Sequence, residues 1–156
     1  MTLTSTGLVG VVKDHIDAIN AFDVDRIMAT FHDEAYLNDF NREIRGPDQI
    51  RRFFQVEFVG DQITMEVVTV ADHFGDVIVT AVFDGTFDRT MLPDGEAPLL
   101  TTYYAVRDDK ITSLFIMSNA PWPGPPARLL EEPPRPFDPA VDRPAVWPYG
   151  DSGPAQ

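Results

Sequence analysis

The stretch LLTTYYAVRDDKITSLFIM, residues 99–117, decides the fold of this chain. Two runs rich in β-branched and aromatic residues, Leu99–Arg107 and Lys110–Met117, are separated only by Asp108-Asp109. Two such runs around a two-residue turn predict a β-hairpin. The C-terminal half of the folded region is therefore expected to be an antiparallel sheet.

The same alternation extends upstream of this hairpin. It predicts a long strand at Gln62–His73, a turn at Gly75-Asp76 and a second strand at Val77–Asp88. The segment Arg89–Pro98 is rich in turn residues and predicts a loop. Together with the hairpin, these runs give four consecutive strands.

The N-terminal half shows a helical period of apolar residues instead. The first predicted element is a helix at Leu8–Ala21, with Ser5 or Thr6 as its N-cap. A short helix at Val24–Phe31, capped by Asp23, and a strand at Ala35–Phe40 follow. A third helix begins at Gly46-Pro47-Asp48 and ends at Gly60-Asp61. Helices followed by hairpin-connected strands predict an α+β fold, in which a curved, mostly antiparallel sheet packs on three helices around a cavity.

Composition narrows the class of protein. The net charge of −13 argues against nucleic acid and anionic membrane surfaces as partners. The chain has no cysteine, which excludes disulfides and thiolate metal sites. No apolar run approaches the ~20 residues of a membrane span. The first six residues lack the basic and apolar regions of a signal peptide, so a cytoplasmic location is expected.

Proline divides the chain into two regions. Residues 120–156 hold 11 of its 14 prolines, and proline disfavours both helix interiors and central strands. We therefore expect a folded domain at residues 1–119 and a proline-rich extension at 120–156. The extension also holds apolar residues such as Trp122, so it packs on the domain, packs on a partner subunit, or is a free tail.

Two polar residues stand where core residues are expected. His15 lies in the apolar stripe of the first helix with Leu8, Val12 and Ile19, and Asp39 ends the strand Ala35–Phe40. Burial is costly for such groups unless they are paired or functional. Asp39 is a candidate general base and His15 a candidate hydrogen-bond donor or proton shuttle. Alternatively, Asp39 pairs with Arg42 or Arg45, and His15 is a hydrogen-bonded core residue.

Two glutamates are weaker candidates. Glu66 lies on a strand whose two faces both look semi-apolar, so pocket and solvent are equally compatible with it. If it faces inward, it forms a carboxylate pair with Asp39, in which one group is protonated. Glu57 lies on the apolar face of the third helix with Phe53, Phe54 and Phe58, which more often indicates a structural ion pair.

Several local sequences resemble the nuclear transport factor 2-like superfamily, which includes ketosteroid isomerases and SnoaL-like polyketide cyclases. Val11–Asn20 is similar to its first helix, and the following Ala21-Phe22-Asp23-Val24-Asp25 resembles the family turn N-A-G-D-x-D. Phe31-His32-Asp33-Glu34-Ala35 resembles F-A-D-D-A, and Gly46-Pro47-Asp48-Gln49-Ile50-Arg51 resembles G-x-x-A-I-R. The resemblance covers residues 7–119 and implies a cone-shaped α+β fold.

The resemblance also implies site positions. Asp39 falls at the place of the general base of ketosteroid isomerases, and His15 falls at that of the oxyanion-donor tyrosine. The second, acidic donor falls near Thr102, which cannot reproduce an acid, although its hydroxyl or a neighbouring tyrosine offers a donor. The strand-borne aspartate of polyketide cyclases has no counterpart in Lys110–Met117.

These observations predict an acid/base enzyme without a cofactor, acting on a small apolar molecule as an isomerase, cyclase, dehydratase or epoxide-opening enzyme. The alternative is a non-catalytic ligand-binding or dimeric assembly domain. Asp39, His15 and Glu66 are the predicted catalytic residues. The predicted substrate-binding residues are Tyr36, Asn38, Phe54, Glu57, Phe83, Thr102, Tyr104, Phe115 and Trp122. We expect no metal and no cofactor, and we expect a homodimer.

Overall fold

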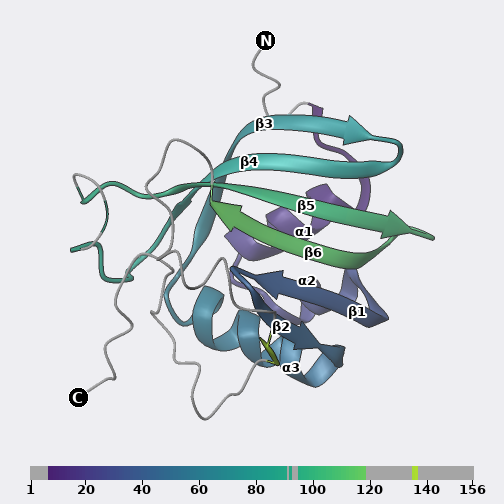
Figure 1. Ribbon diagram of the computed structural model, residues 1–156, viewed down its shortest axis with the longest axis horizontal. Coiled ribbons are helices and arrows are strands. Elements are labelled where there is room, and N and C mark those ends of the chain that lie inside the picture. Colours follow the sequence, from purple (N-terminus) through teal and green to yellow (C-terminus); the bar gives the residue numbers. More distant parts are fainter. Residues whose placement is uncertain (1–6, 91, 93–94, 119–134, 137–156) are drawn as a thin grey trace.

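Three helices lie against one curved β-sheet in the computed structural model (Figure 1). The structure describes residues 7–90, 92, 95–118 and 135–136. Its helices are α1 (Gly10–Asn20), α2 (Val24–Ala29) and α3 (Gly46–Phe53), and α3 continues into a π-helix, η2 (Phe54–Val59). The strands are β1 (Phe31–Asp39), β2 (Arg42–Arg45), β3 (Thr64–His73), β4 (Asp76–Asp84), β5 (Leu99–Arg107), β6 (Lys110–Ser118) and β7 (Arg135–Pro136).

The helices begin close to their predicted positions. The Asp23 side chain accepts a hydrogen bond from the Arg26 amide at 3.1 Å, which confirms the predicted cap of α2. The third helix begins at Gly46 with Pro47 in its first turn, as predicted. Helix α1 differs, because Val9 is its N-cap residue and makes no side-chain cap bond. The predicted caps Ser5 and Thr6 lie outside the described residues.

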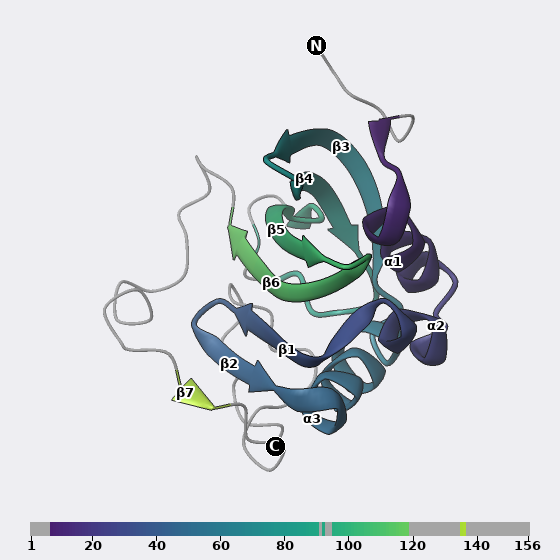
Figure 2. The same ribbon diagram turned by 90° about the vertical axis from the view of Figure 1, so that its right-hand side faces the viewer.

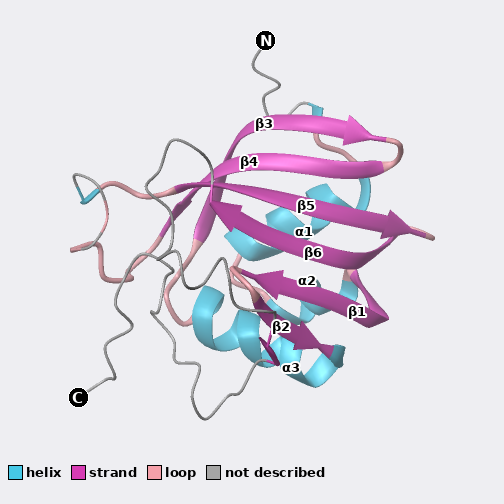
Figure 3. Cartoon of the chain, viewed as in Figure 1, coloured by secondary structure: helices cyan, strands magenta, loops and turns pink. Residues whose placement is uncertain are grey.

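The strand order is β3-β4-β5-β6-β1-β2-β7 (Figure 3). The hairpin of β5 and β6 turns at Asp108-Asp109, as predicted, and both residues have positive φ. Pairing between β1 and β6 is parallel, with Leu37 opposite Leu114. The sequence predicted only hairpin connections at this point. The expected α+β class is nevertheless confirmed.

The first strand is longer than the sequence predicted. It begins at Phe31, which the helical period had assigned to the second helix, and it ends at Asp39. Phe40 and Asn41 follow with φ values of 48° and 72° and make a two-residue turn. Strand β2 then pairs antiparallel with β1 and brings Arg42 opposite Asp39. Because β2 has only four residues, its sequence pattern was too short to predict it.

The curved sheet has an inner face toward the helices and an outer face away from them (Figure 2). Asp39, Ile116, Thr102 and Val79 are paired across four strands and are all buried on the inner face. Aromatic side chains fill the space between the helices and this face. They are Phe53, Phe54, Phe58, Phe83 and Tyr104, all at most 2% exposed.

No helix among the described residues is long and apolar enough to cross a membrane.

Candidate functional site

His15 lies at the centre of an aromatic cluster. Its side chain projects from α1 on the same buried stripe as Val12 and Ile19, as the helical period predicted, and it is fully buried. Its ring centre lies 5.3 Å from that of Phe31, 5.6 Å from that of Phe54 and 5.4 Å from that of Tyr104. All three rings meet the imidazole at steep angles, so they enclose it with apolar edges and faces.

Among the described residues, one polar group bonds to this imidazole. The His15 Nδ1 atom lies 3.1 Å from the Thr30 hydroxyl, and that hydroxyl donates a hydrogen bond of 2.6 Å to the Ile27 carbonyl. The other ring nitrogen, Nε2, is buried and has no hydrogen-bond partner among the described residues. Burial lowers the pKa of His15 to about 3, so the ring is neutral at physiological pH.

A second polar cluster lies at the other end of β1. Arg42 bonds to both Asp39 and Glu57, whose side chains are 8% and 7% exposed. Its Nη2 donates to Asp39 Oδ2 and, over 2.8 Å, to Glu57 Oε1, while its Nη1 donates over 3.2 Å to Glu57 Oε2. The tight β1–β2 turn positions the first pair, and η2 carries Glu57. We call Arg42, Asp39 and Glu57 the ion-pair cluster.

The Asp39 and Glu57 carboxyl groups share the Arg42 guanidinium. Burial lowers the pKa of Arg42, but the opposing charges of Asp39 and Glu57 outweigh it and raise that pKa above its usual value. The guanidinium carbon also lies 5.7 Å from the ring centre of Phe53, which adds a cation–π contact.

The structure does not join His15 and Asp39 in one bonding network. Asp39 bonds to Arg42, whereas His15 bonds to Thr30. Two aromatic rings lie between the clusters. The Phe54 ring contacts His15, and the Phe53 ring lies 5.2 Å from that of Phe54 and against the Arg42 guanidinium. Asp39 is buried on the inner face, as strand alternation predicted, but it takes the ion-pair alternative.

Glu66 and three of the predicted substrate-binding residues lie on the outer face of the sheet. Glu66 is exposed and pairs with Val82, whereas its neighbour Met65 is buried. Glu66 therefore takes the solvent-facing alternative, and the carboxylate pair with Asp39 that an inward direction would give does not form. The other three are Tyr36, Asn38 and Phe115: Asn38 donates to the Tyr36 hydroxyl at 2.9 Å, and the Tyr36 and Phe115 rings lie 5.6 Å apart.

The other predicted substrate-binding residues lie on the inner side. Phe54, Phe83, Thr102 and Tyr104 are buried between the sheet and the helices. Burial raises the pKa of Tyr104, although a hydrogen bond to Thr102 opposes this shift. The Thr102 hydroxyl donates to the Val79 carbonyl at 3.2 Å. Trp122 lies outside the described residues.

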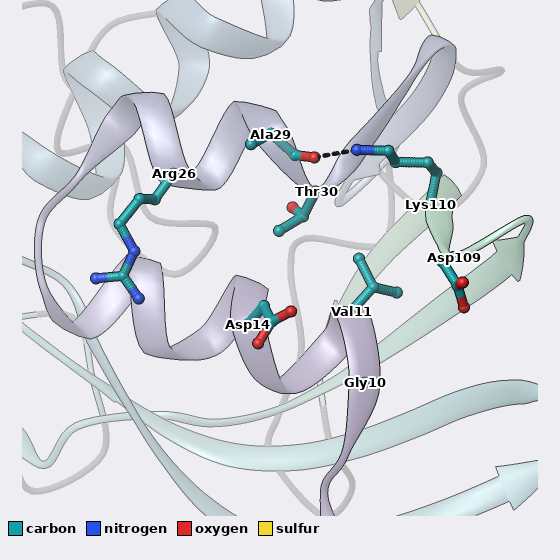
Figure 4. Close-up of a pocket in the computed structure, with 8 residues that line it drawn as sticks. All are labelled: Gly10, Val11, Asp14, Arg26, Ala29, Thr30, Asp109 and Lys110. Carbon is teal, nitrogen blue, oxygen red and sulfur yellow. Dashed lines mark hydrogen bonds between the residues drawn. The ribbon is translucent and has the colours of Figure 1, made fainter.

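A surface pocket of about 600 Å³ lies next to the His15 cluster (Figure 4). It is lined by Gly10, Val11, Asp14, Arg26, Ala29, Thr30, Asp109 and Lys110. Lys110 donates to the Ala29 carbonyl at 2.6 Å across its rim. Thr30 therefore lines this pocket, and its hydroxyl bonds to the buried His15 ring. It is the residue that lies between the ring and the surface.

Sequence reasoning missed Thr30, since a lone threonine after a short helix carries no distinguishing signal. Arg42 was named only as an alternative partner of Asp39. No group of three or more side chains suited to binding a metal ion occurs in the described part of the chain.

The fold and this interior agree with the family comparison. The SnoaL-like domain model matches residues 12–114. The chain belongs to the SnoaL-like family. The resemblance in the local sequences is thereby confirmed, and the family lies within the nuclear transport factor 2-like superfamily. A search of curated proteins finds no match.

Solved structures of similar fold come from several sources. A putative polyketide cyclase from Sinorhizobium meliloti is 22% identical, with a TM-score of 0.63, over 74% of this chain and 100% of that one. A Mycobacterium tuberculosis protein in complex with estradiol-17β-hemisuccinate is 14% identical, with a TM-score of 0.60, over 70% and 92% of the two chains. The Anabaena orange carotenoid protein binding canthaxanthin is 21% identical, with a TM-score of 0.62, over 85% of this chain and 42% of that one.

Proposed function

We propose that this SnoaL-like domain binds a small, largely apolar molecule between its helices and its sheet, with His15 as the polar contact. The observation that carries the proposal is the His15 Nε2 atom, which is buried inside three aromatic rings and lacks a partner in the described protein. A buried polar atom without a partner costs about 1–3 kcal/mol. A bound molecule that forms the missing hydrogen bond removes that cost. The free energy of binding therefore depends on its contact with His15 Nε2.

The walls of the site suit an apolar molecule. Phe31, Phe54 and Tyr104 surround His15, and Phe83 and Phe58 continue the aromatic lining, with ring centres 6.3 Å apart. We expect a ligand to displace one of these closely packed rings. Phe54 is the ring best placed to move, since it begins the π-helix η2, and π-helical turns often occur at functional sites.

Proteins of similar fold support the choice of ligand class. Two of them bind an estradiol derivative and a carotenoid, both mostly apolar. At 14% and 21% identity these likenesses extend to the fold alone. The proposal therefore takes the ligand class from the lining of this interior and not from the neighbours.

Nuclear magnetic resonance titration tests the proposal with 2-decalol, 2-decalone and 17β-estradiol as apolar probes. We expect at least one probe to shift the signals of His15, Phe54 and Tyr104. Phe54→Trp, which adds volume inside the site, should weaken binding, because overpacked interiors leave no room for a guest. Phe115→Trp, an aromatic substitution on the outer face, is the matched control. The proposal fails if no probe shifts the interior signals, or if only Phe115→Trp alters binding.

A second candidate is cofactor-independent acid/base catalysis on such a molecule. It is supported by the ion-pair cluster, which places the carboxylates of Asp39 and Glu57 beside the aromatic interior. In this scheme Asp39 abstracts a proton next to a carbonyl, which requires that Arg42 first releases its carboxylate. The ligand-binding function is preferred because the structure engages Asp39 in an ion pair.

Hydrogen exchange at carbon distinguishes the two candidates. An enzyme of this kind should accelerate deuterium uptake from D2O at the carbons next to the carbonyl of 2-decalone. The acceleration should disappear in Asp39→Asn and persist in Glu66→Gln, whose carboxylate lies on the outer face. Binding of 2-decalone without any acceleration would exclude the catalytic candidate for ketones and leave ligand binding.

The homodimer, the cytoplasmic location and the boundary between residues 1–119 and 120–156 stay predictions. The outer sheet face supports a dimer, because it carries partly exposed apolar residues such as Leu99 and Met117, which are 38% and 41% exposed. Sedimentation velocity of the wild type and of Met117→Glu tests this point. A monomeric wild type at micromolar concentration would contradict it.

A further inference from the structure

We infer that His15 selects a ligand through a neutral hydrogen-bond donor, such as a hydroxyl group, and discriminates against a carbonyl oxygen. This inference rests on the proposed ligand-binding function and specifies the chemistry of its polar contact. It is the opposite of the oxyanion-donor role that the family resemblance implies for this position.

The Thr30 hydroxyl has one hydrogen to donate. The Thr30 Oγ1 atom lies 2.6 Å from the Ile27 carbonyl oxygen. Two oxygen atoms this close need a hydrogen between them, and the carbonyl has none. A threonine at a helix end commonly bonds back to a carbonyl of the preceding turn in this way. The Thr30 hydrogen is therefore directed at Ile27.

The hydrogen of the contact between Thr30 and His15 must then come from the imidazole. The Nδ1 atom of His15 lies 3.1 Å from Thr30 Oγ1, which accepts through its remaining lone pairs. A neutral imidazole has one N–H, and the hydrogen bond made by one nitrogen determines the state of the other. Since Nδ1 carries the hydrogen, Nε2 presents a lone pair.

The surroundings of Nε2 restrict the group that can face this lone pair. The walls are the apolar rings of Phe31, Phe54 and Tyr104. A charged donor such as an ammonium would be buried without a counter-ion at a high cost. A carbonyl oxygen would face the Nε2 lone pair with a lone pair of its own, and the two acceptors would repel each other. A neutral O–H or N–H group makes the bond at neither cost.

The test compares 2-decalol with 2-decalone, which have the same carbon skeleton and differ in whether their oxygen donates a hydrogen bond. Binding to the full chain is measured by calorimetry or by nuclear magnetic resonance titration. We expect 2-decalol to bind at least about tenfold more tightly, because the ketone leaves Nε2 unpaired. Equal affinities, or tighter binding of the ketone, overturn the inference while leaving the ligand-binding function intact. If neither probe binds, the binding function itself fails for this class of ligand.

Three variants locate the preference at the predicted atoms. Thr30→Val removes the acceptor that fixes the Nδ1 hydrogen, so the other tautomer becomes accessible and the preference for the alcohol should fall several-fold. Thr30→Ser keeps the hydroxyl and should restore the preference. Thr80→Val makes the same substitution on the outer face, where Thr80 faces Thr101, and should leave it unchanged. An unchanged preference in Thr30→Val contradicts the role of Thr30.

The tautomer is also observable without a ligand. Nitrogen-15 spectra of the imidazole distinguish a ring protonated at Nδ1 from one protonated at Nε2. We expect the Nδ1–H form in the wild type and in Thr30→Ser, and a shift toward the Nε2–H form in Thr30→Val. Finding the Nε2–H form in the wild type overturns the inference even if Thr30→Val does not fold.

Discussion

The aromatic interior of this domain has a different kind of polar cluster at each end. At one end, His15 is neutral, makes a single hydrogen bond, and keeps one nitrogen unpartnered in the described protein. At the other end, Arg42 forms ion pairs with Asp39 and Glu57. The comparison teaches that burial alone does not indicate a site. The incompletely satisfied group is the one suited to a ligand, while the fully paired groups hold the hairpin against η2.

The largest effect is expected from removing the cation of the ion-pair cluster. Arg42→Met should destabilise the protein by about 3–5 kcal/mol, because it removes the cation that bonds to two buried carboxylates. Urea unfolding measures the loss. Arg45→Met is the matched control: Arg45 is exposed and pairs with Glu43, so its loss should cost at most about 1 kcal/mol. Similar losses in the two variants would show that the ion-pair cluster does not hold the fold.

Acid should act on the protein partly through His15. Its folded-state pKa of about 3 lies below the ordinary value of 6.5, so between these values the unfolded chain binds more protons than the native one. The contribution of His15 to the free energy of unfolding is therefore fully present above pH 6.5 and is lost as the pH falls toward 3. At 1.4 kcal/mol per pH unit, the loss is about 2 kcal/mol at pH 5. The groups around the ring are Thr30, Phe31, Phe54 and Tyr104, none of which carries a charge there.

Urea unfolding at several pH values measures this slope, and His15→Phe isolates its source. The variant should lose the part of the acid sensitivity between pH 6.5 and 5 that His15 causes. Retention of the complete wild-type slope would place the acid sensitivity in other groups and contradict a neutral, buried imidazole.

At neutral pH the same variant should separate stability from binding. His15→Phe replaces an incompletely bonded polar ring with an apolar one, which should stabilise the fold by about 1 kcal/mol while abolishing the preference for 2-decalol. The measurements are the urea midpoint and the titration of the two decalin probes. A destabilised variant that still prefers the alcohol would remove His15 from the proposed function.

The smallest expected effect is the coupling between the two clusters. Two rings, Phe54 and Phe53, connect them, and they share no hydrogen bond in the described residues. Distant sites are usually additive within about 0.5 kcal/mol. The double variant His15→Phe/Arg42→Met should therefore change the free energy of unfolding by the sum of the single changes. A coupling above about 1 kcal/mol would mean that the clusters act as one site.

Much of the fold was predictable because the alternation of side chains determines which face of a strand is buried. The hairpin at Asp108-Asp109 and the inward direction of Asp39 followed from this rule. The partner of β1 did not follow, since its parallel pairing with β6 depends on contacts far apart in sequence. The register of β3 also shifts between Val67 and Thr69, so its alternation could not decide the face of Glu66.

The candidate site was predictable in position and not in its bonds. The helical period placed His15 in the interior correctly. Its partner Thr30 follows α2 and bonds to His15 only because α1 and α2 pack side by side, which no local pattern specifies. The ion pair between Asp39 and Arg42 depends on the turn at Phe40 and Asn41, both of which have positive φ. The sequence there lacks a characteristic turn pair such as Asn-Gly, so this turn could not be predicted.

The parallel pairing of β1 with β6 has a consequence for how the chain acquires its structure. Leu37 meets Leu114, 77 residues later, so the inner edge of β1 stays unpaired until nearly the whole domain has been synthesised. At about 5–20 residues per second this delay is about 4–15 s on the ribosome. Contacts this distant in sequence also slow folding once the chain is complete. The strand that carries Phe31 and Leu37 therefore keeps two core side chains exposed for that time and is a segment that needs protection from aggregation during synthesis.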